Sequence, residues 1–218
     1  MAPDAGVIDL LGMLAYGELL AFDRMAADAR LAPDLRRQAL LAQMAAAEIG
    51  NYRRLADRLS ALGVDPQDAM APFTAALRTY HDNTEPADWP EALTKAYVGE
   101  GISDDFFREV ARLVPAVSLG DADRALVLDV LHHDDYAVFA AREIRACVAA
   151  EPGLADRLSM WARRLVGEAL SQAQQVAQER ATLTALLLDG GAGEGADGLF
   201  RRLTSAHTAR MTAVGLNN

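Results

Sequence analysis

The sequence predicts an all-α protein, a four-helix bundle with additional helices at the C-terminal end. Ala, Leu and Arg are abundant and runs of β-branched residues are scarce, a composition that favours helices. In the long segments between prolines and glycines, apolar residues recur every three or four positions, as they do in bundle helices. The connecting segments are short, long and short in turn. This order predicts two helical hairpins joined by one long crossover.

The first hairpin is expected to consist of helices over residues 4–29 and 34–62. Pro33 lies in the short connection between them, where it ends the first helical pattern. Asp34 can cap the start of the second helix, and Gly63 can supply the left-handed residue after its end. Because the connection is tight, the two helices should be antiparallel neighbours.

The second hairpin follows a crossover of about 25 residues, which should contain one short helix over residues 73–81. The third long helix is expected to begin at Asp88, with Pro90 in its first turn and Glu91 at the capping-box position. It should end before a proline at position 115. The fourth helix is expected as one continuous segment over residues 121–150.

The C-terminal part is expected to hold a long amphipathic helix over residues 154–188 and a short last helix over residues 199–214. The Gly-rich stretch over residues 190–198 between them is predicted to be a flexible loop. We expect one domain over residues 1–218, with the core bundle over about 5–150 and the C-terminal helices over about 154–214.

A polar residue interrupts the apolar stripe near the middle of each of the four bundle helices. The interrupting residues, helix by helix, are Glu18; Glu48 and Asn51; Glu100 and Asp104; and His133, with Tyr136 three positions later. An unpaired carboxylate in a core costs several kcal/mol, and no Arg or Lys lies on these stripes. The pattern therefore predicts a shared site that holds protons, cations or a metal. Iron or manganese bound by Glu and His suits such a site.

Several longer segments resemble the ferritin-like proteins of actinobacteria, a group described as similar to the tRNA hydroxylase that acts on methylthio-isopentenyl-adenosine. The segments are Ala15–Glu18, Met44–Glu48, Lys95–Ile102, Trp161–Gln174, Ala206–Met211 and Gly215–Asn218. The resemblance covers nearly the whole chain. It implies a ferritin-like four-helix bundle, a di-iron carboxylate centre and non-haem iron hydroxylase or oxidoreductase chemistry.

The sequence departs from the family pattern at the expected metal ligands. The family has Glu-x-x-His in the second helix and acid-x-x-His in the fourth. The corresponding residues here are Glu48 with Asn51 and His133 with Tyr136. Neither an amide nor a phenol replaces a neutral imidazole well. The remaining ligands, which are Glu18, Glu48, Glu100 and His133, could hold one iron or manganese ion or none. Without a metal, some of these glutamates should have a raised pKa.

Three functions stay open, so the sequence leaves open whether the protein is an enzyme. It could be a hydroxylase with an altered iron site, or a non-catalytic binding or scaffold protein. It could also be a metal-free acid–base pocket for a small metabolite, with Tyr136 and His133 as the catalytic pair.

Composition narrows the partners and the compartment. The net charge of -10 disfavours nucleic acid, including a tRNA substrate, because phosphate needs clustered positive charge. A single cysteine, Cys147, excludes a disulfide framework, and we expect no membrane segment and a cytoplasmic location. The partner should be a small molecule or another substrate that the sequence does not name, and the long fifth helix makes a homodimer plausible. Outside the bundle site, His81 is expected at the surface and His207 in a structural contact.

Overall fold

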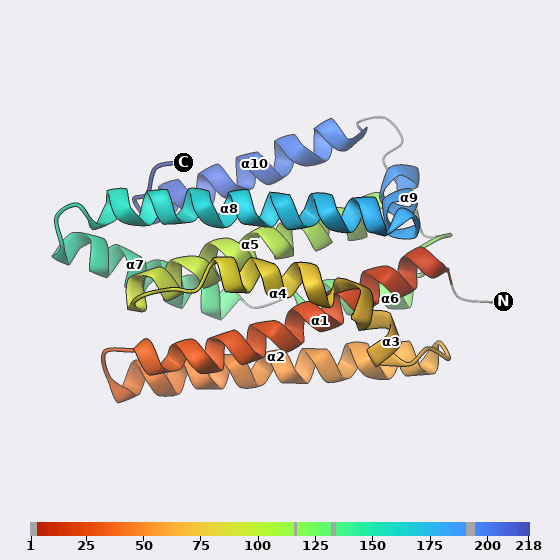
Figure 1. The fold of residues 1–218 in the computed structure, drawn as a ribbon, viewed down its shortest axis with the longest axis horizontal. Coiled ribbons are helices and arrows are strands. Elements are labelled where there is room, and N and C mark those ends of the chain that lie inside the picture. The colour runs from red at the N-terminus through yellow and green to blue at the C-terminus, as the bar shows by residue number, and fades with distance from the viewer. Residues whose placement is uncertain (1–3, 116, 132–133, 191–194) are drawn as a thin grey trace.

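The computed structural model describes residues 4–115, 117–131, 134–190 and 195–218, and the structural statements below refer to these residues. Within them the chain is helical and contains no strand, which confirms the all-α class. The long helices run roughly along one common direction, and α8 (Leu154–Glu179) and α10 (Gly195–Ala213) lie on the opposite side from the first hairpin (Figure 1).

The first hairpin forms as predicted. Helix α1 spans Ala5–Asp28, a 3-10 turn spans Ala29–Leu31, and α2 spans Leu35–Ala61, packed along α1 (Figure 1). The Asp34 carboxylate accepts a hydrogen bond from the Arg37 amide at 2.9 Å and so caps α2. Gly63 follows α2 with φ +79°, a conformation that glycine adopts without strain.

The crossover contains more structure than the one short helix predicted. It consists of α3 (Pro66–Met70), a 3-10 turn (Ala71–Phe73) and α4 (Thr74–Asn83). Helix α3 packs on α1 and α4 packs on α8, so the crossover covers one side of the bundle. Asp65 caps α3 through the amide of Gln67 at 2.7 Å.

The second hairpin begins with α5 (Trp89–Leu113), which Asp88 caps through the Glu91 amide at 3.0 Å, as predicted. The prediction of one continuous fourth helix was wrong: α6 (Asp121–Val130) and α7 (Asp134–Ala150) are separate. The carbonyl of Leu131 accepts from Arg108 Nη2 at 2.7 Å, and the carbonyl of Val130 accepts from Asn51 Nδ2 at 3.2 Å. Side chains of α5 and α2 therefore satisfy the end of α6, where a continuing helix would otherwise do so.

The prediction of one uninterrupted fifth helix over residues 154–188 was also wrong. The helix there is shorter, because the segment is divided at Arg180 into α8 (Leu154–Glu179) and α9 (Ala181–Gly190), which crosses the end of the bundle (Figure 1). The Arg180 guanidinium donates to the buried Asp9 carboxylate of α1, from Nε at 3.3 Å, and the Thr182 hydroxyl donates to the same group. The ion pair between Arg180 and Asp9 of α1 fixes the direction in which α9 leaves α8.

The last helix, α10 (Gly195–Ala213), begins earlier than predicted, within the Gly-rich stretch expected to be a loop. Residues 191–194 of that stretch lie outside the described part of the chain. Helix α10 packs on α5, and the buried Met211 and Val214 anchor its end.

Helix α1 is apolar enough to be compared with a membrane span. By length and composition alone, the segment Ala5–Leu31 could cross a membrane, but 61% of its most apolar window is buried inside the protein. The core helix of a soluble protein has the same property. The burial of α1 is consistent with that assignment.

Arg210 fastens α10 to α5, and Gly101 makes room for it. Arg210 Nη2 donates to the Gly101 carbonyl at 3.0 Å and to the Asp105 carboxylate at 2.6 Å. A Cβ at position 101 would lie 2.2 Å from Arg210 Nε. Gly101→Ala should therefore displace the Arg210 side chain and cost about 1 kcal/mol, since a flexible side chain can move aside.

We expect faster amide hydrogen exchange in α10 of Gly101→Ala, with exchange in α1 and α2 unchanged. Gly167→Ala in α8 is the matched control, because no atom lies within 4 Å of a Cβ there. Unaltered exchange in α10 would contradict the role given to Arg210.

Candidate functional site

A layer of polar side chains separates two apolar clusters within the bundle. One cluster includes Leu11, Leu59 and Phe73, and the other includes Leu93 and Leu158. Along α2 and α5 the polar residues that interrupt the stripes lie between the two clusters, and on α1 Glu18 lies in the last turn of the first cluster. We call this set the carboxyl layer, and its members are Glu18, Glu48, Asn51, Glu100 and Asp104. The structure thus places these five sequence-predicted polar residues at one level of the bundle.

Asn51 organises the buried part of the carboxyl layer. Its Nδ2 donates to Glu18 Oε2 at 3.2 Å and to the Val130 carbonyl at 3.2 Å. Both partners are acceptors, so the hydrogen-bond network directs the amide nitrogen of Asn51, and not its oxygen, toward Glu18. Glu18, Glu48 and Asn51 are 8%, 6% and 6% exposed, so this network is closed to bulk water.

The environment of Glu18 favours its protonated form. Burial raises the pKa of Glu18 far above its ordinary value, and a hydrogen bond to the Glu48 carboxyl together with the charge of Glu48 raises it further. The charge of Glu100 adds to the effect, while the hydrogen bond from Asn51 opposes it. A hydrogen bond between two carboxyl groups requires a proton on one of them, and the raised pKa of Glu18 favours that residue.

The carboxyl layer continues along α5 toward a more exposed rim. Burial, followed by the charges of Glu48 and Asp104, raises the pKa of the half-buried Glu100 well above its ordinary value. Burial raises the pKa of Asp104 to about 7, although Arg108, whose Nη2 lies 3.5 Å from the carboxylate, opposes the rise. Asp104 can therefore gain or lose a proton near neutral pH.

Two tyrosines flank the carboxyl layer. Tyr136 in α7 is buried, and burial followed by the charge of Glu100 raises its pKa well above the ordinary value, so it remains a neutral phenol. Tyr80 in the crossover helix α4 was missed by sequence reasoning. Its hydroxyl is buried and lies 2.9 Å from the place where a Cβ of Gly99 would be. The only sequence signal was the glycine next to Glu100, which permits this close approach.

The donor set of the described residues does not match a dinuclear metal centre. In the described part of the chain, no group of three or more His, Cys, Asp or Glu side chains is placed to hold a metal ion. Asn51 presents N–H donors to Glu18, and Tyr136 is a neutral phenol, so neither offers the lone pair of the imidazole that the family pattern has there. His133, the predicted catalytic residue and fourth metal ligand, lies outside the described residues.

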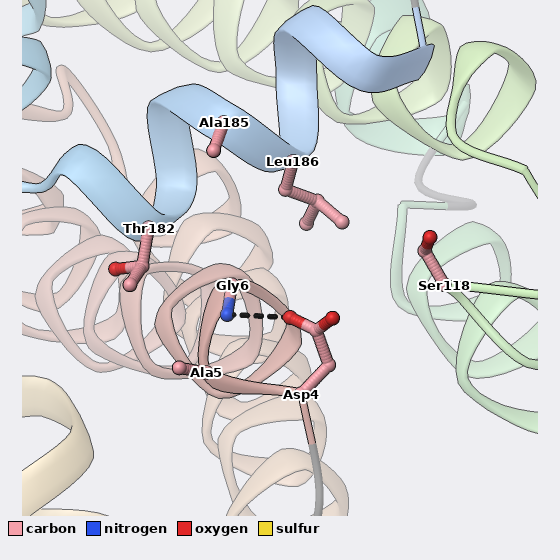
Figure 2. A pocket seen from close by; sticks show the side chains of 7 residues that line it. All are labelled: Asp4, Ala5, Gly6, Ser118, Thr182, Ala185 and Leu186. Carbon is pink, nitrogen blue, oxygen red and sulfur yellow. Dashed lines mark hydrogen bonds between the residues drawn. The ribbon is translucent and has the colours of Figure 1, made fainter.

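A separate open pocket of about 280 Å³ lies where α1 begins, between α9 and the segment before α6 (Figure 2). Its lining includes Asp4, Ser118, Thr182 and Leu186. The Asp4 carboxylate is already used as the N-cap of α1, accepting from the Gly6 amide at 2.7 Å (Figure 2). The pocket shares no residue with the carboxyl layer, so it does not extend that site.

The remaining histidine and cysteine candidates stay outside the carboxyl layer. His207 is buried, and burial and then the charge of Arg210 lower its pKa. Cys147 is half-buried and its thiol has a raised pKa, first because of burial and then because of Glu143. A thiol with a raised pKa is a poor nucleophile, which agrees with an inert Cys147.

Comparison with known proteins identifies the family to which this chain is similar. The family model described as "Ferritin-like domain, actinomycetes" matches residues 2–190. The match includes both hairpins, the crossover, α8 and α9, and it stops before α10. No curated protein matches the chain.

Proposed function

The chain belongs to the actinomycete family of ferritin-like domains, and from that premise we propose that it is an altered member with a proton-holding site in place of a dinuclear iron centre. We propose further that it is a binding or scaffold protein and does not hydroxylate tRNA. The orientation of Asn51 carries this proposal. Where the family pattern has an imidazole lone pair, Asn51 presents an N–H donor to Glu18.

In this proposal the carboxyl layer keeps its charge low by sharing protons. Protonated Glu18 donates to Glu48 and accepts from Asn51, so the buried groups satisfy one another without a cation. No ion pair of the described residues involves Glu18, Glu48 or Glu100. These hydrogen bonds, together with the one from Asn51 to the Val130 carbonyl, link α1, α2 and α6 and hold them in register.

A metal-free acid–base pocket is the second candidate function, and Asp104 favours it. A carboxyl group with a pKa of about 7 is matched to proton transfer near neutral pH, and this one is half-exposed at the rim of the layer. Glu100 and Tyr136 would then supply protons from inside the bundle, with His133 as the proposed fourth group. The ligand would be a small metabolite.

The proposed partners follow from charge. A net charge of -10 works against a tRNA substrate, since nucleic-acid affinity depends on clustered Lys and Arg. We therefore propose a small-molecule ligand. Separately from the charge, we propose a cytoplasmic location and a homodimer formed through the long helix α8. Size-exclusion chromatography with light scattering tests the dimer.

Metal content tests the main proposal. After growth with added iron and manganese, the purified protein should contain far less than one metal ion per chain, because Glu18 is protonated and Asn51 is turned as a donor. Elemental analysis measures this directly. Two irons per chain would overturn the proposal. A single iron or manganese ion, lost in Glu18→Gln, would support a mononuclear site of Glu18, Glu48, Glu100 and His133 instead.

A gain-of-binding variant sharpens the test. Asn51→His combined with Tyr136→His restores the residue types of the family pattern, with His133→Glu as a further change, and should raise the iron content measured under the same conditions. Asn83→His, on the exposed end of α4, is the matched control for an added histidine. If the restored variant binds no more iron than this control, the carboxyl layer does not correspond to the metal site of the family pattern.

A further inference from the structure

A second polar cluster surrounds Lys95, the only lysine of the chain. Lys95 lies on α5 and is 5% exposed, beneath the crossover helix α4. Its Nζ donates to the His81 carbonyl at a long 3.4 Å and lies 5.8 Å from the centre of the Tyr80 ring. The ion pairs of the described residues do not include Lys95, so a buried amine is held by weak contacts alone.

Three buried polar atoms near this amine make no hydrogen bond. They are Arg24 Nε on α1 and, on α4, the Tyr80 hydroxyl and His81 Nδ1. Buried polar groups in folded proteins are almost always paired, so each exception needs an explanation. Three exceptions on two helices lie around one amine, and a polar ligand there would give them partners.

The electrostatics of the cluster increase the neutral fraction of the Lys95 amine. Burial, with a contribution from the charge of Arg24, lowers the pKa of Lys95 to about 8, while Asp28 opposes this. Burial lowers the pKa of His81 to about 3, so its ring is neutral, with one nitrogen able to donate a hydrogen bond and the other able to accept one. Burial raises the pKa of Asp28, and the positive charge of Lys95 opposes this rise.

We propose that the Lys95 cluster binds a small 2-oxo acid and forms an imine with it. The Arg24 guanidinium would bind the carboxylate: its buried Nε makes no hydrogen bond, and its contacts with Asp23 at 3.8 Å and with Asp82 at 3.5 Å are long ion pairs that a ligand carboxylate could replace. The Lys95 amine would face the keto carbon over the Tyr80 ring, and His81 Nδ1 would donate a hydrogen bond to the keto oxygen. Arg24 would favour a 2-oxo acid, which carries a carboxylate, over an uncharged aldehyde.

The covalent step needs no oxidant or reductant. The lone pair of neutral Lys95 Nζ forms a bond to the keto carbon while the carbonyl π electrons move to oxygen, and a proton passes from nitrogen to that oxygen. The carbon–oxygen bond of the resulting carbinolamine then breaks, a second proton goes to the leaving oxygen, and one water leaves as the C=N bond forms. The acidic group whose charge acts most strongly on Lys95 is Asp28, and it would carry these protons. The step is reversible by addition of water.

This inference is independent of the proposed function, because it uses neither the carboxyl layer nor any metal. Tyr80 lies between the two regions, with its ring near Lys95 and its hydroxyl against Gly99. A protein that binds iron could still form the imine, and a protein without metal could fail to do so.

Reductive trapping with pyruvate tests the proposal on the full-length protein. Cyanoborohydride should convert the imine to a stable secondary amine, which intact mass spectrometry detects as one added group. Peptide mapping then assigns it, since the only other amine is at the N-terminus. Labelling of Lys95 should saturate with pyruvate concentration and should disappear when the protein is unfolded in urea.

The variants separate binding from simple amine reactivity. Arg24→Gln should raise the pyruvate concentration needed for half-labelling about tenfold, as expected for loss of a charge-assisted contact, and should leave labelling by acetaldehyde nearly unchanged. Arg53→Gln, at an exposed position of α2, is the matched control. Lys95→Arg should abolish labelling at position 95, and its circular dichroism reports whether the variant folds.

Several outcomes would overturn the proposal. These are labelling confined to the N-terminal amine, labelling of Lys95 that does not saturate, or equal labelling of folded and unfolded protein. An equal loss of pyruvate and acetaldehyde labelling in Arg24→Gln would remove the 2-oxo acid as the ligand class.

Discussion

Glu18→Gln is expected to stabilise the protein, and the gain should grow as the pH rises from about 5 to about 8. Folded Glu18 keeps a proton that the unfolded chain releases above its ordinary pKa of 4.5. Each pH unit above that value therefore costs the wild type about 1.4 kcal/mol in free energy of unfolding, until the pH reaches the raised pKa of the folded state. Glutamine carries no ionisable group, so the variant does not incur this loss.

The sign follows from which state holds more protons. For Glu18 the folded state holds more between the two pKa values, so its contribution is complete below pH 4.5 and declines at higher pH. His81 acts in the opposite direction, since its folded pKa of about 3 lies below 6.5 and stability rises with pH in that interval. Because His81 is present in both proteins, the difference between variant and wild type isolates Glu18.

Glutamine also preserves the contacts of protonated Glu18. Its amide oxygen can accept from Asn51 Nδ2, and its amide nitrogen can donate to the Glu48 carboxylate, so no buried group loses its partner. Urea unfolding with chelator present, at several pH values, measures the effect. Glu151→Gln, at an exposed position, is the control and should show a constant difference. A constant difference for Glu18→Gln as well would contradict a proton held by Glu18.

The position of the carboxyl layer could be predicted because helical periodicity assigns residues to faces. Glu18, Glu48 and Glu100 interrupt apolar stripes at similar distances from their helix ends, and antiparallel hairpins bring such positions to one level. The same periodicity places Asp104 on the stripe of α5. The orientation of the Asn51 amide depends on the Val130 carbonyl, a contact across 79 positions that no local pattern encodes.

Long-range contacts also explain the helix breaks that sequence reasoning missed. The segments around Leu131 and Arg180 contain no proline or glycine, so local propensity favours continuous helices there. Arg108 donates a hydrogen bond to the Leu131 carbonyl, and the Asp9 carboxylate accepts one from the Arg180 guanidinium. Tyr80 was missed for a related reason, because the crossover has no fixed register against the bundle until the chain has folded. Tertiary contacts of this kind override local preference.

Gly12→Ala is expected to destabilise the protein by about 1–3 kcal/mol, the cost of overpacking a well-packed core. A Cβ on Gly12 in α1 would lie 2.3 Å from the carbonyl oxygen of Ala69 in α3 and 2.7 Å from its carbonyl carbon. Both obstacles are backbone atoms, so no side-chain rotation can relieve the clash. Either α3 must move away from α1, or the buried Phe73 that follows it must repack.

Gly17→Ala in the same helix is the matched control, because no atom lies within 4 Å of a Cβ at that position. There the substitution removes only the entropic cost of a helical glycine, so it should stabilise by about 0.5–1 kcal/mol. The two alanine variants should therefore move the midpoint of thermal unfolding in opposite directions, by about 2–4 °C per kcal/mol for a chain of this size. If both variants gain stability, α3 does not approach α1 as closely as the Gly12–Ala69 contact requires, and the crossover that carries Tyr80 and His81 is less firmly anchored than this structure indicates.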